Sequence, residues 1–136
     1  MHCQNFEITD DNIGIIFDDD YFDLHNEYDL TSHTYNEELK EAQFTWRKVN
    51  ESKQITLCFR DVTLYKTNPR DPSIPESEDL TISFIGFLHP DEIDVMDGYA
   101  SNSDFIAGNH FIIGLESEAA FKVGAESAIC TIINDV

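Results

Sequence analysis

The sequence is poor in cysteine and in basic residues, and both shortages limit what the protein can be. Its three cysteines, Cys3, Cys58 and Cys130, lie far apart and form no Cys-x-x-Cys pair. This spacing argues against a disulfide framework or a zinc site and favours reduced thiols in a reducing compartment. Eight Lys and Arg stand against 27 Asp and Glu, which gives a net charge of −19. That sign disfavours nucleic acid and anionic membrane surfaces as partners.

Long apolar runs are also missing. No stretch approaches the ~20 apolar residues of a membrane-spanning helix, and no basic region followed by an apolar stretch opens the chain. We therefore expect a cytoplasmic protein. Apolar residues still make up 41% of the chain, including ten Phe and five Tyr, so it is not a disordered acidic tail. Its length fits a single domain over residues 1–136.

The charge is unevenly distributed along the chain. Residues 1–39 contain eleven Asp and Glu but no Lys or Arg, and residues 71–121 again contain eleven acidic and no basic residues. Between them, residues 40–70 contain seven basic and three acidic residues. Two acidic flanks thus enclose a mildly basic segment. A charge of this size keeps a protein soluble and speeds its encounter with positive partners.

Alternation of apolar and polar residues predicts β-strands. Residues 43–49 and 54–59 each place their apolar side chains at every second position, so each run can bury one face of a strand. Together they predict a hairpin with its turn at 50–53. The next apolar residue after Phe59 is Val62, a step of three that a β-bulge at Arg60 and Asp61 would absorb.

Further strands follow on either side of this hairpin. A first hairpin is expected from residues 6–8 and 13–17, with Asp18, Asp19 and Asp20 ending it. Thr34 and Glu37 have the spacing of a capping box, so a short helix over 35–42 is one interpretation. The other is that the strand ending at Val49 begins near Glu41. Residues 21–33 show no clean period.

The second half of the chain reads as loops and strands. The prolines of residues 67–79 predict a surface loop, and residues 90–109 a second, acidic one. Residues 80–88 end apolar on both faces, which suits a central strand. Two or three further strands are expected from the apolar runs at 111–115, 120–123 and 129–133.

Taken together, these patterns predict an all-β fold. The chain has seven or eight strands, at most one short helix and apolar faces that need a covering layer. An antiparallel two-layer β-sandwich or bent half-barrel satisfies these requirements.

Motifs for catalysis are absent. There is no Gly-x-Ser-x-Gly, no phosphate-binding glycine loop and no histidine pair with ligand spacing. We therefore expect no enzyme activity, no cofactor and no metal site. The run from Asp18 to Asp20 with Asp23 has the oxygen ligands that Ca²⁺ prefers, but neighbours in an extended run point to opposite faces. The acidic residues at 91–97 lack the spacing and the final Glu of an EF-hand.

Aromatic residues within acidic stretches are the remaining signal. Tyr21, Phe22, Tyr28, Tyr35 and Tyr99 fall where no core strand is indicated. Aromatic anchors surrounded by charge are typical of a protein-binding face. The alternative is that some of them cover an open sheet edge.

In size, acidity and β pattern, and in its aromatic segments 18–23 and 91–99, the chain resembles the immunity proteins that bacteria make against nuclease toxins, including those of contact-dependent inhibition systems. The resemblance implies that clustered carboxylates occlude the basic active-site cleft of a toxin. It implies a monomer or weak homodimer with these partner-binding residues: Asp18, Asp19, Asp20, Tyr21, Asp23, Asp91, Asp94, Asp97 and Tyr99.

Two alternatives remain. The chain can be a ligand-binding β-sandwich whose acidic loops hold Ca²⁺ or a small polar molecule. It can also be a subunit of an assembly in which the basic hairpin of one copy meets an acidic flank of another.

Overall fold

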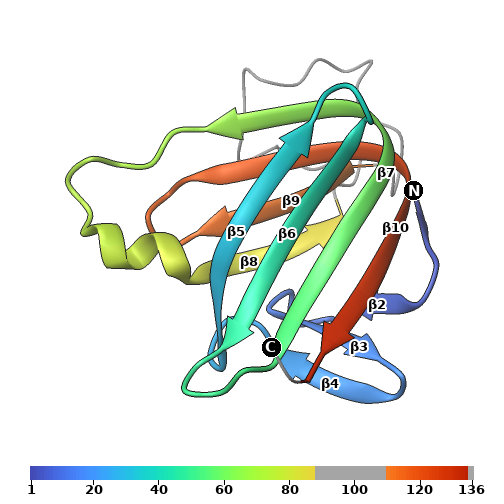
Figure 1. Cartoon of the computed structure of the whole chain (residues 1–136). Coiled ribbons are helices and arrows are strands. Elements are labelled where there is room, and N and C mark those ends of the chain that lie inside the picture. The colour runs from blue at the N-terminus through green and yellow to red at the C-terminus, as the bar shows by residue number, and fades with distance from the viewer. Residues whose placement is uncertain (88–109, 135–136) are drawn as a thin grey trace.

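The computed structural model describes residues 1–87 and 110–134, which form a β-protein with a single short 3₁₀ helix (Figure 1). Its elements are β1 (His2–Cys3), β2 (Phe6–Ile8), β3 (Gly14–Phe17), β4 (Asp20–Asp23), β5 (Tyr28–Asn36), β6 (Glu41–Lys48), β7 (Gln54–Asn68), η1 (Glu76–Leu80), β8 (Ile82–Phe87), β9 (His110–Leu115) and β10 (Ala120–Ile133). The described part contains no helix long and apolar enough to cross a membrane.

The strands form one large sheet and one small sheet. The large sheet has the order β5-β6-β7-β10-β9-β8 with antiparallel neighbours, and β1 adds to β10 in parallel. The small sheet has the order β2-β3-β4. The large sheet curls on itself, as Figure 1 shows, so the predicted all-β fold is confirmed in its half-barrel form.

The curl comes from two long strands, β7 with 15 residues and β10 with 14. The curled sheet has two layers. The front layer contains β5, β6, the first half of β7 and the second half of β10, and the back layer contains β8, β9, the second half of β7 and the first half of β10. The register between β7 and β10 shifts where Val62 and Leu64 face Ala125 and Gly124. Asp61, just before the shift, has φ 55°. The register shift therefore lies beyond Val62 and not at Arg60 and Asp61, where the sequence predicted a bulge. Phe59 and Val62 are nevertheless both buried, with Asp61 in the left-handed region between them.

Aromatic side chains fill the space between the two layers. Phe44 of β6 contacts Phe121 of β10 with ring centroids 5.5 Å apart, and Phe59 of β7 contacts Phe111 of β9 at 4.8 Å. Trp46 beside them is also fully buried. Burial of each such side chain stabilises the fold by roughly 1.5–3 kcal/mol.

Both predicted hairpins are confirmed. β6 and β7 pair from Glu41 with Arg60 to Arg47 with Gln54, and residues 49–53 connect them. β2 and β3 pair from Phe6 with Phe17 to Ile8 with Ile15.

The short helix predicted over 35–42 is wrong. β5 continues to Asn36, β6 begins at Glu41, and the connection turns with Lys40 at φ 52°. Thr34 pairs with Gln43 in the ladder, so strand pairing replaces the local capping pattern. The alternative, a strand that begins near Glu41, is confirmed.

One prediction for the second half is corrected. The strand expected at 80–88 as a central strand is β8, which stands last in the order of described strands. Of the two or three strands expected after it, the structure has two, because residues 120–133 form the single continuous strand β10. The loop predicted at 67–79 is confirmed at its centre, but β7 runs to Asn68 and η1 begins at Glu76.

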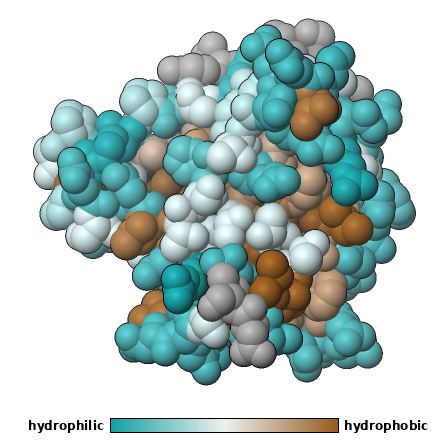
Figure 2. All heavy atoms as spheres, viewed as in Figure 1, coloured by the Kyte–Doolittle hydropathy of each residue, from teal (hydrophilic) through white to brown (hydrophobic). Residues whose placement is uncertain are grey.

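A neutral row of hydroxyl-bearing residues lies on the outward face formed by β5, β6, the first half of β7 and the second half of β10. A row of paired residues crosses four strands from Ser32 through Thr45 and Thr56 to Thr131. The Thr45 and Thr56 hydroxyls lie 3.0 Å apart. Figure 2 shows a pale band of intermediate hydropathy across the middle of this face, with hydrophilic and some hydrophobic patches around it.

Candidate protein-binding face

The small sheet β2-β3-β4, called the acidic sheet below, is the candidate site. Residues 5–27, which contain it, have no Lys or Arg. Their eight acidic residues are Glu7, Asp10, Asp11, Asp18, Asp19, Asp20, Asp23 and Glu27. Figure 1 shows this sheet at one end of the half-barrel, so its carboxylates lie on a separate part of the surface.

Asp18 and Asp19 form the tight turn between β3 and β4. Phe17 pairs with Asp20 across it, and both turn residues have positive φ, 52° and 64°. Two positive φ values are the signature of a type I′ hairpin turn, and Asp tolerates this region better than most residues. The acidic run therefore continues the hairpin into β4 instead of ending it as predicted. The three carboxylate residues, 18 to 20, are exposed.

A cross-strand row lies on the outward face of the acidic sheet. Glu7 of β2, Ile16 of β3 and Tyr21 of β4 are paired neighbours. Ile16 is 37% exposed and Tyr21 49% exposed. This outer row, Glu7-Ile16-Tyr21, places apolar contact area directly beside a carboxylate.

Tyr21 lies in a fixed position across this face. A Cβ added to Gly14 would come within 2.9 Å of the Tyr21 ring, so only glycine lets the ring lie this close to the sheet. The Tyr21 hydroxyl donates to Asp11 Oδ2 at 3.1 Å. Partial desolvation, followed by this bond and the nearby carboxylates, raises the pKa of Tyr21 to about 12. Tyr21 is therefore a rigid, neutral anchor at ordinary pH.

Asp11 is itself held by neighbouring groups. Its carboxylate accepts hydrogen bonds from the Thr9 hydroxyl, the backbone N–H of Ile13 and Tyr21. The pKa of Asp11 is lowered chiefly by the Thr9 hydrogen bond, with smaller contributions from the other two donors. Asp11 thus stays charged and orients the anchor.

Asp23 mainly organises the turn that follows β4. Its carboxylate accepts from the backbone N–H of His25 at 3.2 Å, and from the backbone and side-chain N–H groups of Asn26 at 2.9 and 2.8 Å. Of the predicted partner-binding residues in this sheet, Asp23 has the most of its hydrogen-bonding capacity already used.

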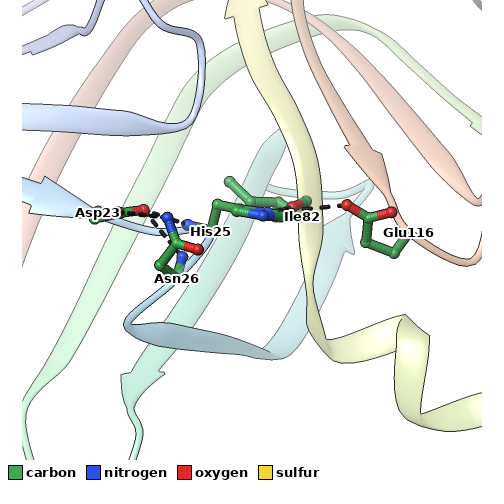
Figure 3. Close-up of polar contacts among 5 residues, drawn as sticks. All are labelled: Asp23, His25, Asn26, Ile82 and Glu116. Carbon is green, nitrogen blue, oxygen red and sulfur yellow. Dashed lines mark hydrogen bonds and ion pairs between the residues drawn. The ribbon is translucent and has the colours of Figure 1, made fainter.

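This turn positions His25 against the large sheet, as Figure 3 shows. His25 Nδ1 lies 2.5 Å from the Ile82 carbonyl oxygen and 3.9 Å from Glu116 Oε1. A carbonyl can only accept, so Nδ1 carries the proton. His25 therefore joins the acidic sheet to β8 and to the β9–β10 turn.

Other contacts join the acidic sheet to the half-barrel. The Asn5 side chain donates to the Cys130 carbonyl and accepts from the Cys130 N–H, both at 2.8 Å. The Lys53 ammonium lies 5.8 Å from the centre of the Phe22 ring. Phe6 and Ile15 belong to the common buried core. The sheet is thus anchored through its edges and its inner face.

A hollow of about 380 Å³ lies beside the acidic turn. Its walls include Gln4, Asn5, Glu7 and Ile16 as well as the turn residues Asp18 and Asp19. The hollow continues the outer row toward the N-terminal strand, so a side chain of a partner can enter next to the carboxylates.

The remaining sequence predictions have different outcomes. Tyr28 is only 3% exposed and belongs to the core, so its prediction as a surface anchor is wrong. Tyr35 stacks on Tyr65 with centroids 4.6 Å apart while staying 37% exposed.

Asp91, Asp94, Asp97 and Tyr99 lie outside the described residues. Residues 1–87 and 110–134 contain no group of His, Cys, Asp and Glu that could hold a metal ion.

Glu7, Asp11 and Ile16 were not singled out from the sequence. Ile15, Ile16 and Phe17 are all apolar, so alternation alone does not show which side chain faces outward. The register with β2 and β4 decides it. No family model, curated protein or solved structure matches this chain.

Proposed function

We propose that the acidic sheet binds a cationic protein surface, and that this surface is the active-site cleft of a nuclease toxin. The outer row carries the proposal: an exposed Tyr21 and Ile16, next to Glu7 and the Asp18–Asp19 turn, on a segment without Lys or Arg. An exposed tyrosine ring surrounded by carboxylates fits a partner whose surface is positively charged.

Rigidity supports this function. Tyr21 is held by Asp11 and Gly14, and the sheet is tied to the half-barrel through Asn5 and His25. Binding then orders few side chains, so less of the interaction energy is lost to conformational entropy.

Inhibition would follow from occupancy of the cleft. A nuclease cleft binds phosphates through positive side chains, and the carboxylates of the acidic sheet can take the place of those phosphates. Tyr21 and Ile16 would supply the desolvated contact, while the exposed carboxylates speed the encounter.

The test uses a basic nuclease domain as the partner, sought first among the products of the genes that neighbour the gene of this chain. Association and dissociation rates are measured by stopped flow at increasing salt, together with inhibition of nucleic-acid cleavage. The informative variant, Asp18→Asn with Asp19→Gly, removes two charges but keeps residues favoured in a type I′ turn. Its matched control, Glu37→Gln with Glu38→Gln, removes two exposed charges from the β5–β6 connection.

The expected result is slower association for the first variant only, and weaker binding at high salt for the native chain. Tyr21→Ala should increase the dissociation rate, whereas Tyr35→Ala, at the other exposed tyrosine, should not. Equal effects of the two charge variants, or binding that is indifferent to salt, would overturn the proposal.

A further inference from the structure

The free edge of the large sheet is the second feature of the surface that points to a partner. β5 stands first in the sheet order, and β6 is its strand partner in the described chain. From Thr31 to Asn36 every residue is exposed. In an antiparallel ladder, alternate residues direct their N–H and C=O groups away from the neighbouring strand. The backbone of 32–36 makes no other backbone hydrogen bond among the described residues.

This edge has few of the features that normally prevent strand pairing. Natural edges are blocked by Lys, Pro, inward charges, bulges, short length or a covering helix or loop. The short helix η1 lies close to β5 and is the one element of the described chain that flanks this edge. β5 is nine residues long, and Leu30 to Asn36 contain no Asp, Glu, Lys, Arg or Pro. A register shift between Leu30 and Ser32 leaves the stretch 32–36 regular. An uncharged edge is unexpected in a chain of net charge −19.

The edge is also held in place. His33 lies against Phe121 with ring centroids 4.5 Å apart, and Tyr35 stacks on Tyr65. On the outward side, Thr34 pairs with Gln43 and Ser32 with Thr45. A fixed strand loses little conformational entropy when it pairs.

We propose that β5 pairs antiparallel with β5 of a second copy about a two-fold axis, so that the two large sheets become continuous. In such a contact each residue faces a residue of the same strand, and like charges directly opposite one another are destabilising. The uncharged stretch from Leu30 to Asn36 meets this requirement. A cationic partner, by contrast, gains no charge attraction from it. Most other surfaces of two copies repel one another.

The salt dependence of this association has a definite sign. Salt screens the repulsion between two acidic copies, so dimerisation should strengthen as salt rises. Binding of a cationic partner at the acidic sheet should weaken under the same change. Pairing at β5 leaves the acidic sheet free, because β5 and β2–β4 occupy different parts of the molecule (Figure 1).

Sedimentation velocity on the full chain, from micromolar to near-millimolar concentration at low and high salt, tests the proposal. Thr34→Glu places two like charges near the two-fold axis and should weaken dimerisation about tenfold, equivalent to roughly 1.4 kcal/mol. Gln43→Glu is the matched control. It adds the same charge at the residue paired with Thr34, on the same face but one strand further from the edge.

A native dimer that Thr34→Glu weakens and Gln43→Glu retains supports the proposal. A native chain that stays monomeric throughout, or an equal loss in both variants, overturns it. A second measurement needs no variant and therefore applies even if Thr34→Glu fails to fold. Amide hydrogen exchange of residues 32–36 in the native chain should be slower at high protein concentration than at low concentration. Equal exchange at both concentrations would overturn the pairing.

Discussion

The half-barrel and the acidic sheet share one core but differ in the charge of the surfaces they expose. The front layer of the half-barrel exposes a neutral row of hydroxyl groups from Ser32 to Thr131. The acidic sheet exposes Glu7, Ile16 and Tyr21 beside an Asp-Asp turn. Because Phe6 and Ile15 are buried with the residues of the large sheet, the separation of charge does not require a separate domain. A single apolar interior can thus support one surface segment that has acidic but no basic residues and another that carries a neutral row of hydroxyl groups.

The largest expected effect tests whether the two sheets really fold as one unit. Phe44→Ala removes a fully buried ring that contacts Trp46, Phe59 and Phe121, and should lower the free energy of unfolding by about 3–5 kcal/mol. Chemical denaturation followed by tryptophan fluorescence and by amide signals of β2–β4 should give a single coincident transition. Two separate transitions would show that the acidic sheet folds independently.

A smaller effect is expected inside the acidic sheet. In Gly14→Ala the new Cβ would lie 2.5 Å from the Phe22 carbonyl oxygen and 2.9 Å from the Tyr21 ring. We expect a loss of about 1–3 kcal/mol of stability from this overpacking, with displacement of Tyr21. Thermal unfolding measures the first effect, and absorbance titration of tyrosine the second. Gly86→Ala is the control, because its nearest neighbour would lie at 3.4 Å.

The attachment between the two sheets is tested by Asn5→Ala. This change leaves the N–H and C=O of Cys130 without their side-chain partner, at a cost of roughly 1–3 kcal/mol. Because the lost contact joins the sheets, hydrogen exchange should accelerate more in β2–β4 than in β6. Uniform acceleration would instead indicate that Asn5 stabilises the whole fold equally.

The half-barrel should also respond to pH through His33. Neighbouring groups, among them the Phe121 ring, partly desolvate the exposed His33 and lower its pKa, and Asp79 partly opposes this shift. The folded protein therefore favours neutral His33. The resulting stability is complete above the unfolded-state pKa near 6.5 and decreases as pH falls toward the lower folded-state pKa. Denaturation between pH 7.5 and about 5 should show a smaller decrease for His33→Gln than for the native chain.

The smallest effect concerns the anchor of the acidic sheet. Asp11→Asn removes a charge and a hydrogen bond that help raise the pKa of Tyr21 to about 12. The Tyr21 pKa should fall part of the way toward 10, because desolvation remains. Tyrosine absorbance measured against pH should detect this change, with Asp19→Asn as a control that leaves it unaltered. An unchanged titration in Asp11→Asn would mean that the neighbouring carboxylate does not fix the anchor.

Strand positions were predictable wherever burial alternates along the chain. Phe44 and Trp46 showed one strand of the main hairpin. The three-residue step from Phe59 to Val62 predicted a bulge at Arg60 and Asp61, but the register shift of β7 with β10 lies beyond Val62. Asp18 and Asp19 suggested an end to the first hairpin because acidic runs usually lie in loops. They instead fit the positive φ values of a tight turn.

The missed features depend on contacts between distant residues. Thr34 and Glu37 form a credible local capping pattern, yet Thr34 pairs with Gln43 once β6 is in place. The outward position of Ile16 is likewise set by Glu7 and Tyr21 on the neighbouring strands. Local sequence therefore identified most strands, whereas strand order and the composition of the candidate face followed from tertiary structure.

At the Asp18–Asp19 turn between β3 and β4, the charge of the side chains can be changed without changing the backbone conformation. The backbone conformation of this turn suits Asn-Gly as well as, or better than, two aspartates. Folding therefore does not require aspartate at these two positions. Replacing both aspartates with Asn-Gly should therefore keep or raise the stability of the hairpin. If the acidic sheet binds a cationic surface as proposed, the two turn charges can therefore be varied for binding while the backbone of the turn is kept.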